Sequence, residues 1–368
     1  MKKFVAILLS ISVLLVFAPS SLMVNAYEVN ENSTAAILKV YEDLPQTEGL
    51  GKLSHDEQVE LCQIPEDILK TIDTESLVDI VLDYPLFMDI YAFDTIELGI
   101  YFLCVNYNGL GELATRDDAP AILLDKYLQT EPIISTKAIE KSDDIFELAN
   151  IEALLAQDFI REKLDKQELD MLDYAVGAKY VIKKEHSDIY AFTSAMFYDA
   201  YTETVENSKI ETASTGYTVY TPKGTPVSVE KKGETLTPTE KTVMNEYVAT
   251  YYSSSIKIAE PTTNYNCHSY AWYLESTSNL FWMDYPYAYM SDGSYYSTST
   301  AAVNNKIAFY NAGTLIHSGI VKNTTYLAPT GLGVHSKWGA YGLYNHAPAY
   351  SPYWSSNNTT LTQYTKSY

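Results

Sequence analysis

The spacing of apolar residues divides the chain into a helical region and a strand-rich region. Between residues 34 and 175, apolar residues recur three and four positions apart, the repeat of one face of an α-helix. Most of these stretches have Asp, Thr or Pro near their start, as helices often do. They are Thr34–Leu44, Pro65–Thr71, Thr74–Leu82, Phe93–Tyr107, Ala119–Leu128 and Asp144–Leu155. No fixed-period repeat joins them, so the pattern predicts an irregular all-α domain.

The pattern changes at about residue 216. Two short alternating runs, Tyr217–Tyr220 and Val227–Val229, flank a Pro/Gly turn and predict paired strands. A helix is expected from Thr237 to about Tyr252, because Pro238 suits a first helical turn. An aromatic run, Tyr190–Tyr201, predicts one further helix before this boundary.

The last hundred residues predict an antiparallel sheet. Lys306–Tyr310 and Thr314–Val321 read as a hairpin closed by a turn at Asn311–Gly313, and Leu332–Ser336 reads as a third strand. We therefore expect an α+β fold overall, with an all-α domain followed by a domain built from a helix and an antiparallel sheet.

Charge follows the same division. Residues 27–215 carry 39 acidic and 14 basic side chains, whereas residues 216–368 carry 8 acidic and 9 basic ones. The acidic surface of residues 27–215 repels nucleic acid, anionic lipid and anionic wall polymers. This repulsion argues against passive electrostatic adhesion to any of them. The simplest interpretation is a solvated, solubilising face.

The N-terminus has the three parts of a secretory signal. Lys2 and Lys3 precede a mainly apolar run, Phe4–Phe17, and Val24–Ala26 provides small residues for cleavage. The apolar run is shorter than the roughly 20 residues that a membrane span requires, and no later segment is long enough. We expect export from a bacterial cell and a mature chain that begins at Tyr27, without an integral membrane segment. The expected divisions are a signal peptide (1–26), an acidic helical domain of unassigned role (27–215), a linker with a strand pair and a helix (216–259), and a C-terminal domain (260–368).

Cysteine usage points to one reactive thiol. Cys62 and Cys104 lie among apolar residues of the helical region, where they either form one disulfide or remain separate core thiols. Cys267 has chemically useful neighbours instead, because it stands where an extended segment meets a helix and His317 and His335 follow in predicted strands. A helix N-terminus and an imidazole both lower a thiol pKa, and a thiol attacks only as its thiolate. An active Cys267 would then be alkylated with a pH profile displaced below that of a free thiol.

These segments resemble the papain-like NlpC-type cell-wall peptidases over about residues 260–350. The matching elements are Asn266–Tyr270, then Lys306–Tyr310, then His317–Val321, then Val334–Ser336. The family has Asp-Cys-Ser-Gly where this chain has Asn266-Cys267-His268-Ser269, which puts the substrate in question more than the nucleophile. The resemblance implies that Cys267 attacks an amide carbonyl, His317 takes its proton and His335 orients His317.

Other roles follow from the same resemblance. The Cys267 backbone N–H would stabilise the oxyanion and Tyr265 is a candidate second donor. Asn345 and His346 are alternatives to His335. The Gly- and aromatic-rich stretch from Lys337 to His346, which includes Trp338, would line the cleft, opposite Phe281–Tyr289. Each of these residues also has a purely structural interpretation, and His268 is expected to point away from the thiol.

The sequence leaves rival functions open. Cys267, His317, His335 and His346 are residue types that bind zinc. No two of them stand at the short sequence spacing that is typical of zinc ligands, so no metal or cofactor is predicted. The preferred hypothesis is a secreted cysteine hydrolase that cleaves amide or peptide bonds in peptidoglycan, found extracellularly or at the cell wall. A papain-like acyltransferase and a non-catalytic extracellular binding or adhesion protein are the alternatives.

Overall fold

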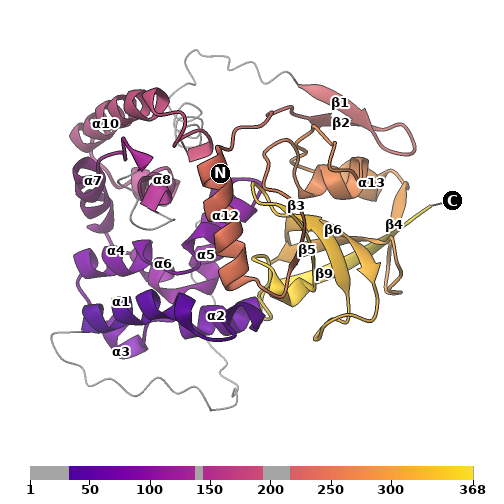
Figure 1. Cartoon of the computed structure of the whole chain (residues 1–368), viewed down its shortest axis with the longest axis horizontal. Coiled ribbons are helices and arrows are strands. Elements are labelled where there is room, and N and C mark those ends of the chain that lie inside the picture. The colour runs from indigo at the N-terminus through magenta and orange to yellow at the C-terminus, as the bar shows by residue number, and fades with distance from the viewer. Residues whose placement is uncertain (1–32, 137–143, 194–215, 368) are drawn as a thin grey trace. The chain divides into compact units, whose positions relative to one another are not determined.

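A computed structural model describes residues 33–136, 144–193 and 216–367. Residues Thr34–Tyr368 form one compact unit. Its N-terminal part is helical and its C-terminal part contains antiparallel sheets, which confirms the predicted α+β class (Figure 1). The predicted signal peptide and residues 194–201 of the predicted aromatic helix lie outside the described residues. Within the described ranges, no helix combines the length and the apolar character needed to cross a membrane.

Most of the stretches that the apolar spacing predicted to be helical do form helices. Other helices lie between or beyond the predicted stretches, at His55–Leu61, Asn108–Leu113, Asp158–Arg161 and over much of Lys166–Glu185. The helices of this region are α1 (Ser33–Asp43), α2 (His55–Leu61), α3 (Glu66–Leu69), α4 (Thr74–Leu82), α5 (Ile96–Asn106), α6 (Asn108–Leu113), α7 (Ala119–Gln129), α8 (Asp144–Leu155), α9 (Asp158–Arg161) and α10 (Lys166–Glu185). A 3₁₀ segment, η3 (Phe87–Ala92), precedes α5 and is entirely buried.

The helix α12 (Pro238–Tyr251) begins with a complete capping box. The Thr237 side chain accepts a hydrogen bond from the Glu240 backbone N–H, and the Glu240 carboxylate accepts one from the Thr237 backbone N–H. Two otherwise unpaired donors are thereby satisfied, which fixes the predicted start of the helix. The helix lies after the strand pair β1 (Tyr217–Tyr220) and β2 (Pro226–Val229), also as predicted.

The C-terminal sheet has seven antiparallel strands in the order β3-β8-β7-β6-β5-β9-β4. Their bounds are β3 (Ile256–Ala259), β4 (Tyr295–Thr298), β5 (Lys306–Asn311), β6 (Thr314–Asn323), β7 (Gly333–Lys337), β8 (Leu343–His346) and β9 (Thr359–Lys366). The predicted β5–β6 hairpin is present, and its turn places Ala312 and Gly313 at φ of 46° and 87°. Glycine adopts this left-handed conformation without steric cost, which explains Gly313.

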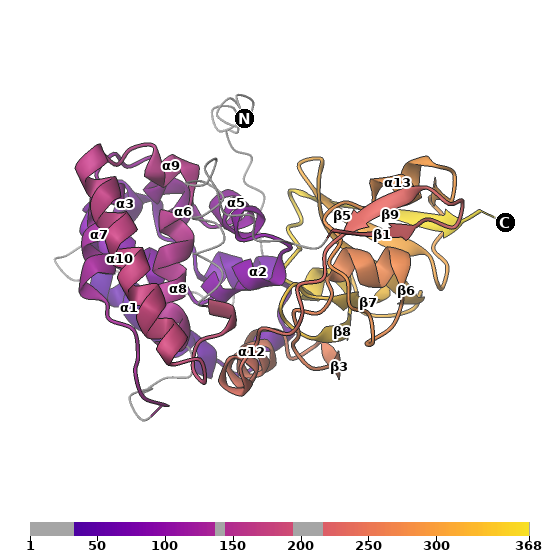
Figure 2. The same ribbon diagram turned by 90° about the horizontal axis from the view of Figure 1, so that it is seen from above.

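The sheet and the helical region share one hydrophobic core. Trp338, Tyr341 and Tyr353 belong to the same buried cluster as Tyr91 and Tyr252. The turn between β7 and β8 packs on η3, since the Ala340 N–H donates to the Tyr91 carbonyl at 3.0 Å. Figure 2 shows α2, at the edge of the helical region, beside the part of the chain that carries the strands.

This packing changes the interpretation of the stretch from Lys337 to His346. Its last four residues form β8, and Trp338 is completely buried against Tyr252, Tyr344 and Tyr353. The stretch is therefore a strand and a core turn, and Trp338 does not line an open cleft.

Candidate functional site

Cys267 stands at the first position of a short helix, as the sequence predicted. The helix runs from Cys267 to Tyr273, and its last five residues form the π-helical segment η5 (Ser269–Tyr273). The Asn266 side chain caps it, because its Oδ1 accepts from the Ser269 N–H at 3.1 Å and from the Met283 N–H at 3.1 Å. The thiol is buried, with Cys267 only 1 % exposed.

Asp94 is the acceptor that the thiol contacts. It lies between η3 and α5, 173 residues before the cysteine, and both of its carboxylate oxygens are 3.7 Å from Cys267 Sγ. His268 Nε2 lies 3.0 Å from Asp94 Oδ2, and Asn266 Nδ2 donates to Asp94 Oδ1 at 3.0 Å. Three consecutive residues at the helix start thus converge on one carboxylate.

His268 is held in place from its other side by β6. Its Nδ1 lies 2.8 Å from Ser318 Oγ, and that hydroxyl also accepts from Trp272 Nε1 at 2.9 Å. The expectation that His268 points away from the thiol is therefore wrong, because the helix turn directs both side chains toward Asp94.

The surroundings of Cys267 favour the protonated thiol. Burial raises the pKa of Cys267 well above that of an ordinary thiol, and the nearby Asp94 carboxylate raises it further. The hydrogen bond from the Ser318 backbone and the charge of Lys337 oppose this shift without reversing it. The structure therefore does not hold Cys267 as the low-pKa thiolate that the sequence predicted. Desolvation of the sulfur raises its pKa by more than the short helix and the neighbouring groups lower it.

His317 is not hydrogen-bonded to Cys267. It is fully buried on β6, stacks on Tyr353 with ring centroids 3.6 Å apart, and packs edge-on against Phe309. Neither ring nitrogen has a hydrogen-bond partner. Burial lowers its pKa well below the usual histidine value, so the ring is neutral.

His335 is not positioned to orient His317. In the β6–β7 register His335 lies opposite Ile320, while Val334 lies opposite Val321. Directly opposed residues share a face and successive residues alternate, so His317 lies on the Val321 face and His335 on the other. Asn345, paired with His335, shares the His335 face, whereas His346, paired with Val334, shares the face of His317. His346 Nε2 is hydrogen-bonded to Ser336 Oγ at 2.6 Å.

The remaining predicted site residue, Tyr265, is buried beside a buried lysine. Its hydroxyl has no hydrogen-bond partner, and Lys337 Nζ lies 5.3 Å from its ring centroid. The same Nζ donates to the carbonyls of Thr262, Gly339 and Tyr341. Tyr265 is thus a candidate donor with a free hydroxyl, held close to the chain segment that carries Cys267.

The three cysteines are free thiols, so Cys62 and Cys104 form no disulfide. Burial raises the pKa of both thiols, that of Cys104 to about 12. Their surroundings are those of inert core thiols.

One group of side chains in the site has the composition of a metal centre. The ligand atoms of Asp94, Cys267 and His268 lie within 4.8 Å of one another. Sequence analysis missed this set because Asp94 belongs to the helical region, where nothing local distinguishes it from other acidic residues.

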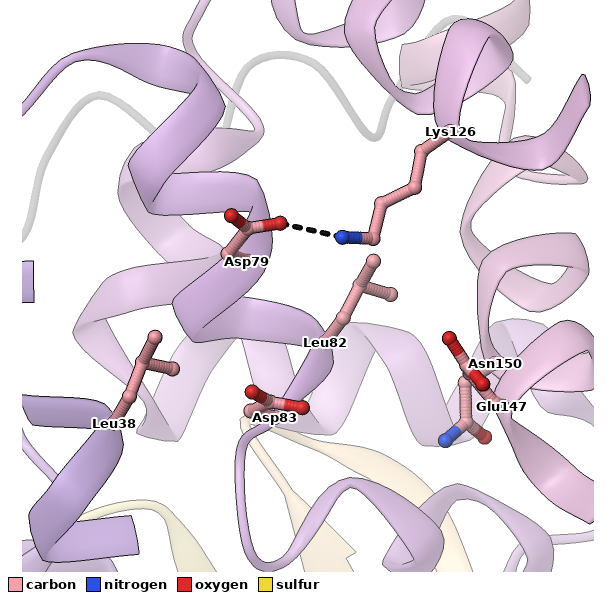
Figure 3. A pocket seen from close by; sticks show the side chains of 7 residues that line it. All are labelled: Leu38, Asp79, Leu82, Asp83, Lys126, Glu147 and Asn150. Carbon is pink, nitrogen blue, oxygen red and sulfur yellow. Dashed lines mark hydrogen bonds and ion pairs between the residues drawn. The ribbon is translucent and has the colours of Figure 1, made fainter. Parts of the chain in front are cut away.

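A separate hollow of about 290 Å³ lies in the helical region, lined by Leu38, Asp79, Leu82, Asp83, Lys126, Glu147 and Asn150. Figure 3 shows the Lys126–Asp79 ion pair at its edge. The Lys126 Nζ and Asp79 Oδ1 atoms are 2.5 Å apart. Asn150 accepts a hydrogen bond from the buried Tyr91 hydroxyl at 2.8 Å. These contacts link α7 to α4 and α8 to η3.

Comparison with protein-family models, with curated proteins and with solved structures found no match for this chain.

Proposed function

We propose that this chain is a secreted bacterial hydrolase that cleaves amide or peptide bonds in peptidoglycan, with Cys267 as its nucleophile. The observation that carries the proposal is the contact of the Cys267 thiol with Asp94, a carboxylate that also holds His268. A thiol, a proton acceptor and an imidazole at one helix start form the set that nucleophilic catalysis uses. Export and the wall substrate rest on the signal-like N-terminus and on the resemblance to cell-wall peptidases.

The reaction would proceed through a thioester. The Cys267 proton passes to Asp94, the sulfur attacks the amide carbonyl, and the amine leaves with a proton. Water then cleaves the thioester, which restores the thiol and releases a carboxylic acid. His268 and Asn266 donate to Asp94 and hold the carboxylate in place, while His317 as general base remains a prediction from the resemblance.

The described arrangement corresponds to a closed form of the site. A polymer substrate reaches a thiol that is 1 % exposed only after the covering side chains move. Such movement would also hydrate the sulfur and reverse the largest cause of its raised pKa, which is burial. Opening and activation of Cys267 are thus coupled.

Release of new amino groups from purified peptidoglycan tests the proposal. Cys267→Ala removes the nucleophile, and loss of a nucleophile lowers the rate by a factor on the order of 10³ or more. Cys104→Ala is the matched control, because it removes a partly buried thiol remote from the site. Equal release by both variants and the unchanged protein would refute Cys267 as nucleophile.

A wall-binding protein without catalysis is the second candidate. The stacked rings of Tyr285 and Tyr287 are 68 % and 49 % exposed, with centroids 5.8 Å apart. Exposed aromatic rings provide flat apolar faces with a polar hydroxyl, suited to sugar rings. Retention on insoluble peptidoglycan, weakened in Tyr285→Ala and unchanged in Cys267→Ala, together with an absence of hydrolysis, would favour this candidate.

A further inference from the structure

We infer that Asp94, Cys267 and His268 form a zinc-binding site that holds the thiol in the closed form. The three ligand atoms lie within 4.8 Å of one another and are supplied by one carboxylate, one thiol and one imidazole. The inference concerns the same sulfur as the proposed function, but it does not depend on hydrolysis.

The donor set selects the metal. Thiolate sulfur and imidazole nitrogen favour zinc over the hard cations magnesium and calcium, which prefer oxygen ligands. Three protein ligands with an open fourth position are typical of zinc sites that exchange ligands, whereas closed structural sites use four. The fourth position would belong to water or to an incoming group.

The separations suit tetrahedral coordination. Zinc bonds of about 2.0–2.3 Å place tetrahedral ligands roughly 3.3–3.7 Å apart. Cys267 Sγ lies 3.7 Å from each Asp94 oxygen, and His268 Nε2 lies 3.0 Å from Asp94 Oδ2. Binding therefore requires that the imidazole and the carboxylate separate by some tenths of an ångström, and that Sγ and Nε2, which lie within 4.8 Å of each other, come to the tetrahedral separation.

Outer hydrogen bonds already orient two of the ligands. Asn266 Nδ2 donates to Asp94 Oδ1, and Ser318 Oγ lies 2.8 Å from His268 Nδ1. In the zinc form, Nδ1–H would donate to Ser318 Oγ and leave Nε2 free for the metal. Ligands of zinc sites commonly carry such partners, and their removal weakens metal affinity about 10- to 100-fold.

Charge balance explains why a cation would be retained. Ionised Asp94 and Cys267 would place two negative charges side by side in a buried site, which is unfavourable without a positive partner. Zinc binding displaces the thiol proton to solvent and forms the Zn–S bond, so one proton is released for each bound ion. A sulfur held in this way is not available for attack on a carbonyl or on an alkylating reagent.

Direct metal binding tests the inference. The mature protein (residues 27–368) would be dialysed against Zn²⁺, the bound metal measured by elemental analysis, and the site loaded with Co²⁺ for absorption spectroscopy. We expect one zinc per chain and a thiolate-to-cobalt charge-transfer band, both lost in Cys267→Ser. Ser318→Ala should weaken zinc binding about 10- to 100-fold while retaining the ligands.

His335→Gln is the matched control, because it removes a histidine on β7 that is not part of the set. Circular dichroism of each apo variant establishes that it is folded. Zinc stoichiometry unchanged by Cys267→Ser, or a cobalt spectrum without the thiolate band, would overturn the site.

Hydrolysis assays separate this inference from the proposed function. Zinc that binds and suppresses both hydrolysis and alkylation supports both. Zinc that binds to a protein without hydrolytic activity supports the site and removes the proposed function. Hydrolysis dependent on Cys267 in a protein that binds no zinc overturns the site alone.

Discussion

Two buried carboxylates, Asp89 and Asp94, lie five residues apart and have different kinds of partner. Asp89 accepts hydrogen bonds from the hydroxyls of Tyr247 and Tyr252 and lies 3.2 Å from His55 Nε2. Asp94 instead faces a thiol, an imidazole and an amide. Each carboxylate contacts one imidazole, so the difference between them is the thiol at Asp94 and the two phenols at Asp89. A thiol can act as a nucleophile once it loses its proton, whereas the buried phenols serve as hydrogen-bond donors.

Asp89 and its three partners, His55, Tyr247 and Tyr252, form a cluster that joins the helical region to α12 and to the C-terminal part. Tyr247 and Tyr252 belong to α12 and its end, and His55 Nδ1 lies 2.6 Å from the Trp354 carbonyl beyond β8. Burial, followed by the Asp89 charge, raises the pKa of both tyrosines well above the usual value, so both remain donors. The comparison teaches that partners decide the role of a carboxylate, since the two are close in sequence and their side chains are only 1 % and 7 % exposed.

Asp89→Asn should have the largest effect on stability. Its amide nitrogen would replace an oxygen that accepts from tyrosine hydroxyls, and broken buried networks cost about 2–3 kcal/mol. Asp94→Asn should cost about 1 kcal/mol or less, because two of the four polar contacts of Asp94 come from a thiol, which is a weak donor. Urea denaturation would measure both, with the exposed Asp67→Asn as control. Equal losses at Asp89 and Asp94 would remove the proposed difference in role.

The buried histidines also differ in their partners, and this difference predicts how the stability of the fold depends on pH. His55 has an oxygen partner at each ring nitrogen, whereas His317 has none, and burial lowers the pKa of His346 to about 4. Between the folded and unfolded pKa values the unfolded chain binds more protons, so stability should fall as pH falls below about 6.5. The expected slope is up to about 1.4 kcal/mol per pH unit for each histidine.

His317→Phe would isolate one of these contributions. The ring stack on Tyr353 can persist, while the protonation difference disappears, so the loss of stability between pH 6.5 and pH 4 should be shallower by about one proton. The slope comes from denaturation midpoints measured across that range. An unchanged slope would mean that His317 is accessible to protons in the folded chain.

Alkylation of Cys267 should report the charge of Asp94. Burial and then Asp94 raise the thiol pKa, so the pH profile for iodoacetamide should lie above that of a free thiol. Removing the charge in Asp94→Asn should lower the thiol pKa and raise the alkylation rate near pH 8, by up to about tenfold. Asp89→Asn serves as the matched control. A similar acceleration in both variants would indicate general loosening instead of a local charge effect.

The smallest effect is expected at His335. Its side chain lies on the opposite sheet face from His317, so His335→Gln should change hydrolysis less than about twofold and stability by less than about 0.5 kcal/mol. A large loss of hydrolysis with intact folding would restore His335 as an orienting residue.

Local patterns determined much of the fold. Amphipathic spacing located α4, α7 and α8, Pro238 in a first helical turn located α12, and period-two alternation around a turn at Asn311–Gly313 located the β5–β6 hairpin. Strands β3, β4, β8 and β9 were missed, because their signal lies in pairing with distant partners.

The sequence by itself determined where a reactive cysteine stands, since an extended segment followed by a helix start is a local property. Only the tertiary structure decided its neighbours. The helical region brings Asp94 to Cys267, and the strand register separates His317 from His335. Contacts between residues more than a hundred positions apart depend on packing, and a one-residue difference in a strand moves a side chain to the opposite face.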